Sequence, residues 1–335
     1  MPFFSRDIGV DLGTMYTQVA EGNQILLQEP TIVAVLVEEM KMVEWGKAAS
    51  DMYGRVPESI DVFRPLQNGV IADFEVTENL LRDLLRRVSG PMGLFKPRVM
   101  ITVPYGITSV ELRAVHEACL GAGSREVYMI WQPLAAALGV DLPISTPSGN
   151  MIISLGGGTT QSAILAMNGI VCAETLRGGG LSLDEAIISY LKKKYGLLVG
   201  QPTAEQLKIK IGSAIPIPQL GSMEIQGQDL VSGLPKPLEV KNVDIVDALE
   251  DTLKEVVLST KRVLEKTPPE LLSDIIDRGA ALCGGGAMLR GIDKYLTKSL
   301  GIPAYLVDNP VTCTVEGTVK GLNIYPQLRR NLPMG

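Results

Sequence analysis

The amino-acid sequence predicts an α/β protein made of two similar halves that face each other across a central cleft. A short apolar run at 150–155, typical of a buried strand, passes directly into three consecutive glycines. The segment at 8–20 repeats this pattern 143 positions earlier and without a gap. The matched pairs are Asp11 with Ser154, Leu12 with Leu155, Gly13 with Gly156, Thr17 with Thr160, Gln18 with Gln161, and Ala20 with Ala163. An internal repeat of this kind indicates a duplicated architecture.

Both glycine turns have the chemistry of a phosphate site. Glycine lets the backbone turn tightly and approach a ligand closely, and the freed N–H groups of such a turn form a nest for phosphate oxygens. Each strand then returns through a Gly/Asn pair typical of a hairpin, at 22–23 and at 168–169. A single glycine turn is equally consistent with a plain tight turn, but two facing turns predict a clamp around a nucleotide.

A third glycine turn follows a strand expected at 280–282. It has the sequence Cys283-Gly284-Gly285-Gly286-Ala287, and we expect a helix to start after it and to run to Leu300. The N-terminus of that helix would offer free N–H groups to an anion or to the sugar–phosphate end of a nucleotide.

Length and composition limit the class of protein. The chain has 335 residues, which suits two domains better than one, and its net charge of −6 argues against a nucleic-acid partner. Its four cysteines, Cys119, Cys172, Cys283 and Cys313, show no C-x-x-C spacing, so we expect reduced structural thiols in a cytoplasmic protein. We expect no signal peptide, no transmembrane segment, and no metal site on the single histidine, His116.

In the first half the pattern predicts a meander of three strands over 7–37 and an irregular insertion over 38–70. Amphipathic or apolar runs then predict helices at 76–88, 109–121 and from Pro133, which suits a first helical turn, and strands at 99–104 and 126–131. The Pro/Ser-rich stretch at 141–149 is interpreted as the crossing into the second half.

In the second half two helix starts are predicted from capping-box spacing. Ser182 and Glu185 form one such pair, and Thr203 and Gln206 form the other. The Pro- and Gly-containing stretch at 214–241 is interpreted as a small subdomain. A long amphipathic helix is predicted over 243–265.

Several motifs are similar to those of a known family. They are Asp11-Leu12-Gly13-Thr14, Asn68-Gly69-Val70-Ile71-Ala72-Asp73-Phe74, Phe95-Lys96-Pro97-Arg98-Val99, Pro133-Leu134-Ala135-Ala136-Ala137, Gly156-Gly157-Gly158-Thr159-Thr160, Pro268-Pro269-Glu270-Leu271, and Leu282-Cys283-Gly284-Gly285-Gly286-Ala287. Over essentially its full length the chain resembles the MreB-type bacterial actins of the actin, Hsp70 and sugar-kinase superfamily.

The resemblance implies an actin-like ATPase fold, in which two duplicated ribonuclease-H-like halves carry small inserted subdomains around a central nucleotide cleft. It implies a first half at 1–145, with an insert at about 34–72, which also receives the C-terminal segment at about 312–335. The second half would span 146–311, with an insert at about 182–241.

The same resemblance implies an ATP-dependent cytoskeletal filament with Mg²⁺ as its metal ion. Family members polymerise into paired protofilaments on the inner face of the cell membrane, and guide cell-wall synthesis in rod-shaped bacteria. The expected partners are therefore further copies of this chain, other MreB paralogues, the cell-wall synthesis machinery and the membrane surface. The apolar pairs Phe3-Phe4 and Leu94-Phe95 match the family's membrane contacts. The second pair lies beside Lys96 and Arg98, which suits a lipid surface, although a loop packed onto its own domain is the alternative.

Carried over by position, the resemblance implies a set of nucleotide-binding residues. Gly13, Thr14, Met15 and Tyr16 would line the phosphates from the first half, and Gly156, Gly157 and Gly158 from the second. Glu205, Gln206, Leu207 and Lys208 would flank the nucleoside, with Gly285, Gly286, Ala287 and Met288 on its other face. Glu205 and Lys208 are equally consistent with a solvated helical ion pair.

The residues expected at the catalytic positions are Asp11, Gln132 and Ser154. Family members carry an acidic residue in place of Ser154 and Glu-Glu-Pro in place of Trp131-Gln132-Pro133, so only Asp11 remains to hold Mg²⁺, through water. Serine cannot supply the charge that polarises an attacking water, and Met15-Tyr16 adds bulk where the family has Ala-Asn. We therefore expect a paralogue that binds nucleotide and hydrolyses it slowly or not at all, unless another carboxylate substitutes or the turn shifts to use Asp11 alone.

Three other functions share this fold. A sugar-type kinase would need a substrate pocket with a base, usually Asp, and no apolar loop at 92–95. An Hsp70-type chaperone would need a further peptide-binding domain. A passive scaffold would co-assemble with an active paralogue. Sedimentation with ATP separates the filament from the kinase and the chaperone, because filaments pellet.

Overall fold

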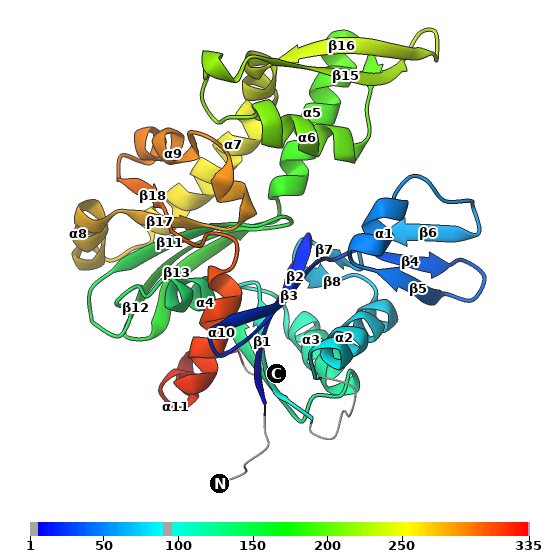
Figure 1. Cartoon of the computed structure of the whole chain (residues 1–335). Coiled ribbons are helices and arrows are strands. Elements are labelled where there is room, and N and C mark those ends of the chain that lie inside the picture. The colour runs from blue at the N-terminus through cyan, green and yellow to red at the C-terminus, as the bar shows by residue number, and fades with distance from the viewer. Residues whose placement is uncertain (1–5, 90–95, 334–335) are drawn as a thin grey trace.

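Two five-stranded sheets with the same topology form the centre of the molecule. The computed structural model describes residues 6–89 and 96–333. The first sheet has the strand order β10-β9-β1-β2-β3 and the second has the order β13-β12-β11-β17-β18 (Figure 1). Their strands are β1 (Asp7–Leu12), β2 (Tyr16–Glu21), β3 (Gln24–Pro30), β9 (Arg98–Val103), β10 (Glu126–Trp131), β11 (Asn150–Leu155), β12 (Thr160–Ala166), β13 (Gly169–Leu176), β17 (Ala280–Cys283) and β18 (Ala304–Leu306).

The sequence repeat is also a repeat of strand register. Asp11 lies opposite Gln18 in the antiparallel pair β1·β2, and Ser154 lies opposite Gln161 in β11·β12. In each half the first strand also pairs in parallel with a later strand, β9 or β17. The two halves are therefore duplicated as predicted, and the fold is α/β and actin-like.

Two helices pack between the sheets and link them. Helix α4 (Gln132–Gly139) packs against β9, β10, β11 and β12, and α10 (Cys313–Asn323) packs against α4, β1 and β9 (Figure 1). The buried cluster around them takes side chains from both sheets, such as Met100 and Ile152. Helix α10 thus lies on the first sheet, whereas the domain limits expected from the sequence stay a prediction.

The two helices cross at a pair of glycines. A Cβ atom added to Gly317 would lie 1.7 Å from the carbonyl oxygen of Ala135, and one added to Gly139 would lie 1.8 Å from that of Cys313. Because real Cβ atoms are not found this close to backbone atoms, only glycine at both positions permits this crossing.

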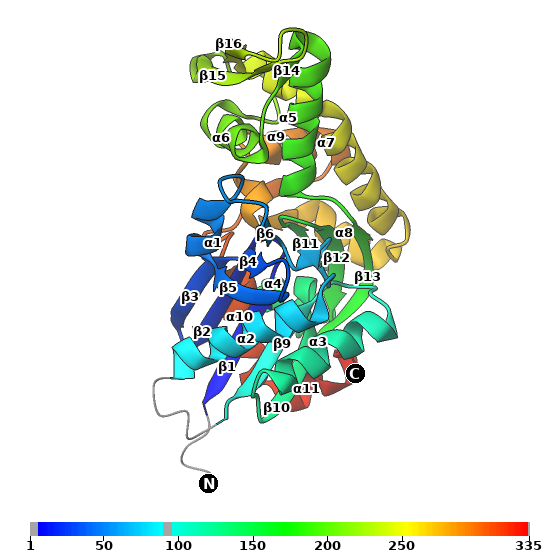
Figure 2. The same ribbon diagram turned by 90° about the vertical axis from the view of Figure 1, so that its right-hand side faces the viewer.

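Further helices pack in pairs on each half of the molecule. Helices α2 (Phe74–Ser89) and α3 (Ser109–Gly121) pack together on the first half, and α5 (Gly180–Tyr195) packs beside α7 (Asn242–Glu265) on the second (Figure 2). The second half also contains helices α8 (Pro269–Arg278) and α9 (Ile292–Leu300), and α11 (Tyr325–Leu328) follows α10. Short 3₁₀ turns lie at Pro218–Leu220 and Arg329–Asn331.

Both insertions are more regular than the sequence predicted. The meander over 7–37 contains four strands, since β4 (Val33–Leu36) joins a separate sheet with β5 (Lys41–Trp45) and β6 (Ile60–Phe63). The segment 38–70, expected to be irregular, also holds α1 (Lys47–Met52), and β7 (Leu66–Gln67) pairs with β8 (Val70–Ile71). The prediction was wrong because Gly46, Gly54, Pro57 and Pro65 divide this stretch into elements too short to show a period.

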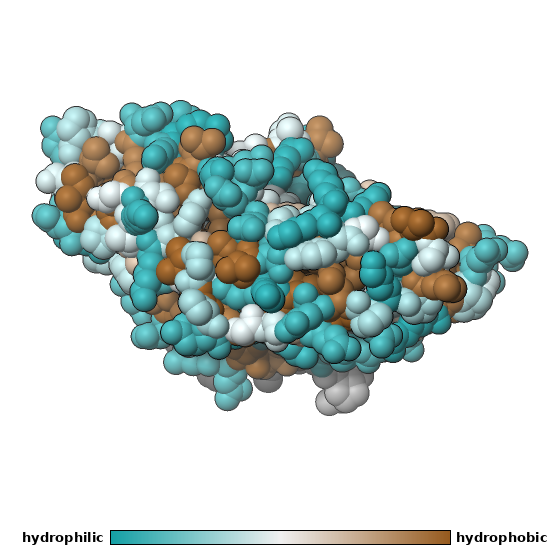
Figure 3. All heavy atoms as spheres, turned by 90° about the horizontal axis from the view of Figure 1, so that it is seen from above, coloured by the Kyte–Doolittle hydropathy of each residue, from teal (hydrophilic) through white to brown (hydrophobic). Residues whose placement is uncertain are grey.

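The second insertion forms a sheet of β14 (Leu197–Leu198), β15 (Ser222–Asp229) and β16 (Pro235–Lys241) beside α6 (Gln201–Ile211). The loop between β15 and β16 carries strongly exposed apolar residues, with Val231 97% and Leu234 65% exposed. Seen from above, apolar residues are scattered among hydrophilic ones on this face of the molecule (Figure 3).

Three predicted helix starts were wrong. Helix α5 starts after Gly179 and α6 after Gly200, and neither has a side-chain cap. Glycine occupies the N-cap position of both helices, so the capping boxes predicted at 182 and 203 do not form. After the third glycine turn the chain forms only a 3₁₀ turn, Gly285–Met288, and α9 begins at Ile292 because left-handed Gly291 separates the two.

Candidate functional site

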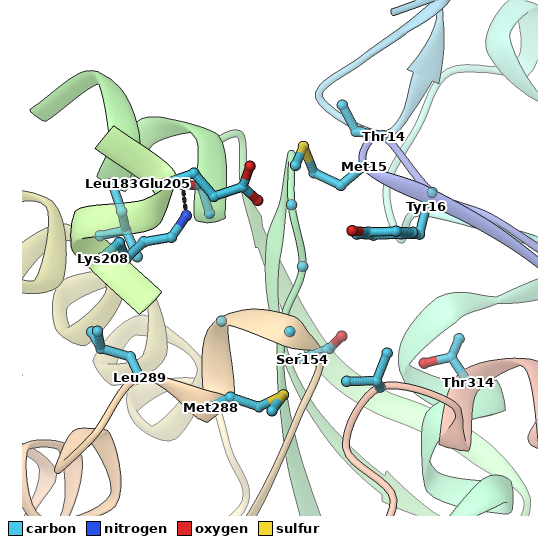
Figure 4. A pocket seen from close by; sticks show the side chains of 18 of the residues that line it. Thr14, Met15, Tyr16, Ser154, Leu183, Glu205, Lys208, Met288, Leu289 and Thr314 are labelled. Carbon is cyan, nitrogen blue, oxygen red and sulfur yellow. Dashed lines mark hydrogen bonds between the residues drawn. The ribbon is translucent and has the colours of Figure 1, made fainter. Parts of the chain in front are cut away.

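A cavity of about 540 Å³ lies between the two halves, next to the glycine turns. It brings together most of the residues predicted from the sequence, from both halves of the chain (Figure 4). These are Asp11, Gly13, Thr14, Met15, Tyr16, Gln132, Ser154, Gly156, Gly157, Glu205, Lys208, Gly285, Gly286 and Met288. One surface is therefore formed by segments that lie more than 270 positions apart in the sequence.

Four predicted residues lie off this surface. On helix α6, Glu205 and Lys208 face the cavity, whereas Leu207 is fully buried in the core and Gln206 points to solvent. Since residues three apart share a face of a helix, four consecutive positions could not all line one site. Ala287 is buried in the core of the second half, and Gly158 packs against Thr14.

The two phosphate-type turns have the same hydrogen bond. The N–H of Gly13 donates to the carbonyl oxygen of Tyr16 at 3.1 Å, and the N–H of Gly156 donates to that of Thr159 at 2.8 Å. A Cβ atom at either glycine would come within 2.6 or 2.9 Å of the accepting oxygen. Glycine is therefore required at both turns by close approach of the backbone.

The two turns also touch each other across the cavity. The side chain of Met15 packs against Gly157, where a Cβ atom would lie 2.2 Å from Met15 Cγ, and Thr14 packs against Gly158. Figure 4 shows Met15 extending toward the turn of the second half, with the Tyr16 hydroxyl directed into the cavity. The bulk expected from Met15-Tyr16 thus does lie between the turns.

Asp11 is the carboxylate that lines the cavity beside the glycine turns. Its Oδ1 atom accepts a hydrogen bond from Thr102 Oγ1 at 2.6 Å and a longer one from Gln132 Nε2 at 3.5 Å. Burial raises the pKa of Asp11 to about 6, while these two hydrogen bonds act in the opposite direction.

The residues present fit a water-mediated Mg²⁺ ion better than a directly ligated one. Within 6–89 and 96–333, no group of three or more His, Cys, Asp or Glu residues could hold a metal ion. Both described hydrogen bonds of Asp11 reach Oδ1, which leaves Oδ2 for a ligand on the cavity side. Mg²⁺ usually keeps several waters and uses one or two carboxylates together with phosphate oxygens, which a single Asp can satisfy.

Ser154 is buried, only 3% exposed, at the cavity end of β11. Its neighbours on adjacent strands are Gln161 and Cys283. The Cys313 thiol and burial raise the pKa of Cys283, so this thiol stays protonated. Ser154 and these two neighbours therefore supply no charge at the position where the resemblance implies an acidic residue.

On the α6 side of the cavity, Lys208 is paired with a residue that the sequence did not reveal. Lys208 Nζ lies 2.7 Å from Asp184 Oδ1 and donates to the carbonyl oxygen of Gly180 at 2.8 Å. Gln201 Nε2 donates to the other oxygen of Asp184 at 3.1 Å. Burial raises the pKa of Asp184, and Lys208 opposes that shift. Lys208 therefore belongs to a buried pair with Asp184 rather than to the solvated pair with Glu205 considered above.

Several other lining residues were missed by sequence reasoning. Leu183, Ile209 and Leu289 give the side of the cavity next to Lys208 an apolar surface, and Thr314 enters from α10 (Figure 4). Among these residues, only Ile209 could have been expected from the sequence to line the cavity, because it directly follows Lys208.

The apolar residues expected to contact a membrane, Phe3, Phe4, Leu94 and Phe95, lie outside the described residues. Across the ranges that the structure describes, no helix combines the length and the apolar character needed to cross a bilayer.

Two sheets of the same topology, joined at paired glycine turns around one cavity, define a protein of the actin-like class. Comparison with known proteins narrows this class further. A family model for the MreB/Mbl protein matches residues 5–330, and the chain belongs to the MreB/Mbl family.

The similarity extends over nearly all of the chain. It is 41% identical over 327 residues to the cell shape-determining protein MreB of Escherichia coli (strain K12), covering 96% of this chain and 94% of that protein. It is 42% identical over 317 residues to the cell shape-determining protein Mbl of Bacillus subtilis (strain 168), covering 94% and 95%.

Solved structures show the same fold. The crystal structure of MreB5 of Spiroplasma citri bound to ADP matches with a TM-score of 0.92 and 33% identity, over 98% of this chain and 100% of that one. A MamK double helical filament matches with a TM-score of 0.80 and 20% identity over 98% and 100%, which is a likeness of fold.

Proposed function

We propose that this chain is an ATP-binding cytoskeletal protein that polymerises into membrane-associated filaments and helps to determine rod cell shape by organising cell-wall synthesis. The observation that carries the proposal is the cavity between two duplicated glycine turns, whose backbone N–H groups suit phosphate oxygens. The ADP bound to MreB5 of Spiroplasma citri supports a nucleotide as its ligand. The implied Mg²⁺ would bind through water at Asp11, and would neutralise phosphate charge.

Self-assembly is supported by the family and by its structural neighbours. Relatives at 41–42% identity are cell shape-determining proteins, and MamK of the same fold forms a double helical filament. The proposed partners are therefore further copies of this chain, other MreB paralogues and the cell-wall synthesis machinery, on the cytoplasmic side of the membrane.

Hydrolysis is proposed to be slow or absent. Catalysis of phosphoryl transfer depends mainly on positioned groups that stabilise charge and orient water. Asp11 is the one carboxylate among the three proposed catalytic residues, since Ser154 and Gln132 are uncharged. Losing a single stabilising group of this kind commonly costs a factor of about 10²–10³ in rate.

Phosphate release in Mg-ATP, recorded together with light scattering, tests this function. We expect scattering that depends on ATP, with phosphate release far slower than assembly. The double variant Ser154→Asp with Gln132→Glu should raise phosphate release at least tenfold. Ser145→Asp with Gln206→Glu adds the same charges at exposed positions and serves as the control. Steady phosphate release by the unmodified protein, or no gain from the double variant, would contradict slow hydrolysis, and absence of scattering would contradict the filament.

Membrane contact is tested by co-sedimentation with vesicles that contain phosphatidylglycerol. We expect binding to fall when Phe3 and Phe4, or Leu94 and Phe95, are changed to serine. Leu258→Ser, at an exposed apolar position on α7, is the control. Equal binding by all variants would exclude both segments as membrane contacts.

A further inference from the structure

Behind the cavity, three side chains form a directional chain of hydrogen bonds that ends on Asp11. The backbone N–H of Tyr105 donates to Gln161 Oε1 at 2.8 Å, and Gln161 Nε2 donates to Gln132 Oε1. Gln132 Nε2 then donates to Asp11 Oδ1 at 3.5 Å. Gln161 is 1% exposed and does not itself line the cavity, whereas Gln132 does.

The direction of this chain is set at both ends. The N–H of Tyr105 can only donate, and an ionised carboxylate can only accept. Turning the Gln132 amide over would place its Nε2 against Nε2 of Gln161, and its Oε1 against Asp11. Turning both amides would move the conflict to Tyr105, where two donors would meet. The arrangement observed is therefore the one that satisfies every member of the chain.

A second short chain reaches the same oxygen. The N–H of Leu12 donates to Thr102 Oγ1 at 3.3 Å, and Thr102 Oγ1 donates to Asp11 Oδ1 at 2.6 Å. Because both chains start from backbone N–H groups, each delivers a donor to Asp11. The Gln132 amide thus presents N–H rather than C=O at this end of the cavity.

We propose that Gln161 is a positioning residue that turns the carbonyl oxygen of Gln132 away from the cavity, so that Gln132 holds a terminal phosphate and cannot orient the attacking water. The proposal rests on the nucleotide-binding function above, and deepens it.

The chemistry explains why this orientation matters. In ATP hydrolysis the water oxygen bonds to the γ-phosphorus and the bond to the ADP oxygen breaks. One water proton must pass to an acceptor, which leaves ADP and inorganic phosphate. A group that orients this water has to accept a hydrogen bond from it. Gln132 Oε1 already accepts one from Gln161, while the second proton on Gln132 Nε2 is free to bind a phosphate oxygen.

Replacing Gln161 by glutamate reverses the chain. A glutamate would accept from Tyr105 through one oxygen, and its other oxygen would face both Gln132 and Thr159 Oγ1, which lies 3.3 Å from Gln161 Nε2. When Gln132 donates its Nε2 to this oxygen, its Oε1 turns toward the cavity. The 3.5 Å contact with Asp11 is the longest in the chain, and breaks most readily. Gln161→Leu, by contrast, removes the chain without supplying a new acceptor.

The experiment measures single-turnover phosphate release at saturating Mg-ATP, with nucleotide affinity measured separately. We expect Gln161→Glu to raise the rate at least tenfold, because it turns Gln132 Oε1 toward the cavity. Gln161→Leu only releases Gln132 and should raise the rate less than the glutamate variant does. The glutamate variant should also weaken ATP affinity, since it withdraws the Gln132 N–H from the terminal phosphate. In a Gln132→Leu background, Gln161→Glu should have no effect. Gln161→Asn, which cannot span both partners, should behave like the leucine variant, and replaces it if that one does not fold.

Equal rates for the glutamate and leucine variants would overturn the proposal, as would a gain that persists without Gln132. Fast release by the unmodified protein would instead overturn only slow hydrolysis, since the ratio between the two Gln161 variants is independent of the starting rate.

Discussion

The crossing of helices α4 and α10 at Gly317 makes a strong prediction about stability. Gly317→Ala would place a Cβ atom 1.7 Å from the Ala135 carbonyl oxygen, 2.6 Å from its carbon and 2.9 Å from the nitrogen of Gly139. Real Cβ atoms essentially never lie within about 3 Å of such atoms, so the two helices must separate by more than 1 Å. All three clashing atoms belong to backbone, which cannot rotate away as a side chain can.

The cost is estimated from overpacking. Extra atoms in a packed core usually cost about 1–3 kcal/mol, and occasionally more. Because this clash lies between two backbones, we expect about 3–5 kcal/mol, from which about 1 kcal/mol of improved helix propensity is recovered. The entropy of unfolding is about 2.1 cal/mol/K per residue, or about 0.7 kcal/mol/K for this chain, so Tm should fall by about 3–6 °C.

Thermal and urea unfolding measure this effect. Gly321→Ala, one turn further along α10, is the matched control, since its nearest new contacts are side-chain atoms of Met100, Ile130 and Leu138. Gly321→Ala should lower the free energy of unfolding by at least 2 kcal/mol less than Gly317→Ala does. Nucleotide affinity should also fall in Gly317→Ala, because Thr314 on the same helix lines the cavity. A Gly317→Ala variant within 1 kcal/mol of the unmodified protein would refute the reasoning.

Three further predictions concern charge and assembly. Folded Asp11 binds its proton more tightly than an unfolded Asp, with a pKa of about 6 against 3.8, so the free energy of unfolding without metal should fall as pH rises from about 4 to 6 and stay lower above that. Asp11→Asn should therefore raise Tm in EDTA more at pH 8 than at pH 4.5. An equal rise in Tm at both pH values would contradict the pKa shift. Lys208→Met leaves Asp184 buried without its cation and should lower the free energy of unfolding in urea by about 3–5 kcal/mol. Adding Asp184→Asn should restore most of the lost free energy. Additive losses from the two substitutions would argue against the pair. Val231→Glu, in the exposed β15–β16 loop, should reduce pelleting with ATP and leave Tm unchanged. Val110→Glu on α3, where Val110 is 77% exposed, should leave both pelleting and Tm unchanged. Equal pelleting by both variants would exclude that loop as a contact between subunits.

The sequence by itself determined the duplicated fold and the two glycine turns that border the cavity. Its information there is local, because a strand, a glycine turn and a hairpin are each encoded by a few consecutive residues. Repetition at a constant offset then related Asp11 to Ser154, and the structure confirms this in the matching strand registers. Short elements, such as the strands within 38–70, were missed because turn residues interrupt any period before it can be recognised.

Only the tertiary structure decided which side chains act on one another. Gln161 and Gln132 come from different halves of the chain, Asp184 and Lys208 lie on neighbouring helices, and the glycine of α10 meets α4 from 178 positions away. These contacts depend on how the two sheets and the helices between them pack, so no local pattern encodes them. They decide whether a polar group in the cavity donates, accepts or is already paired, and so what the site can do with a bound phosphate.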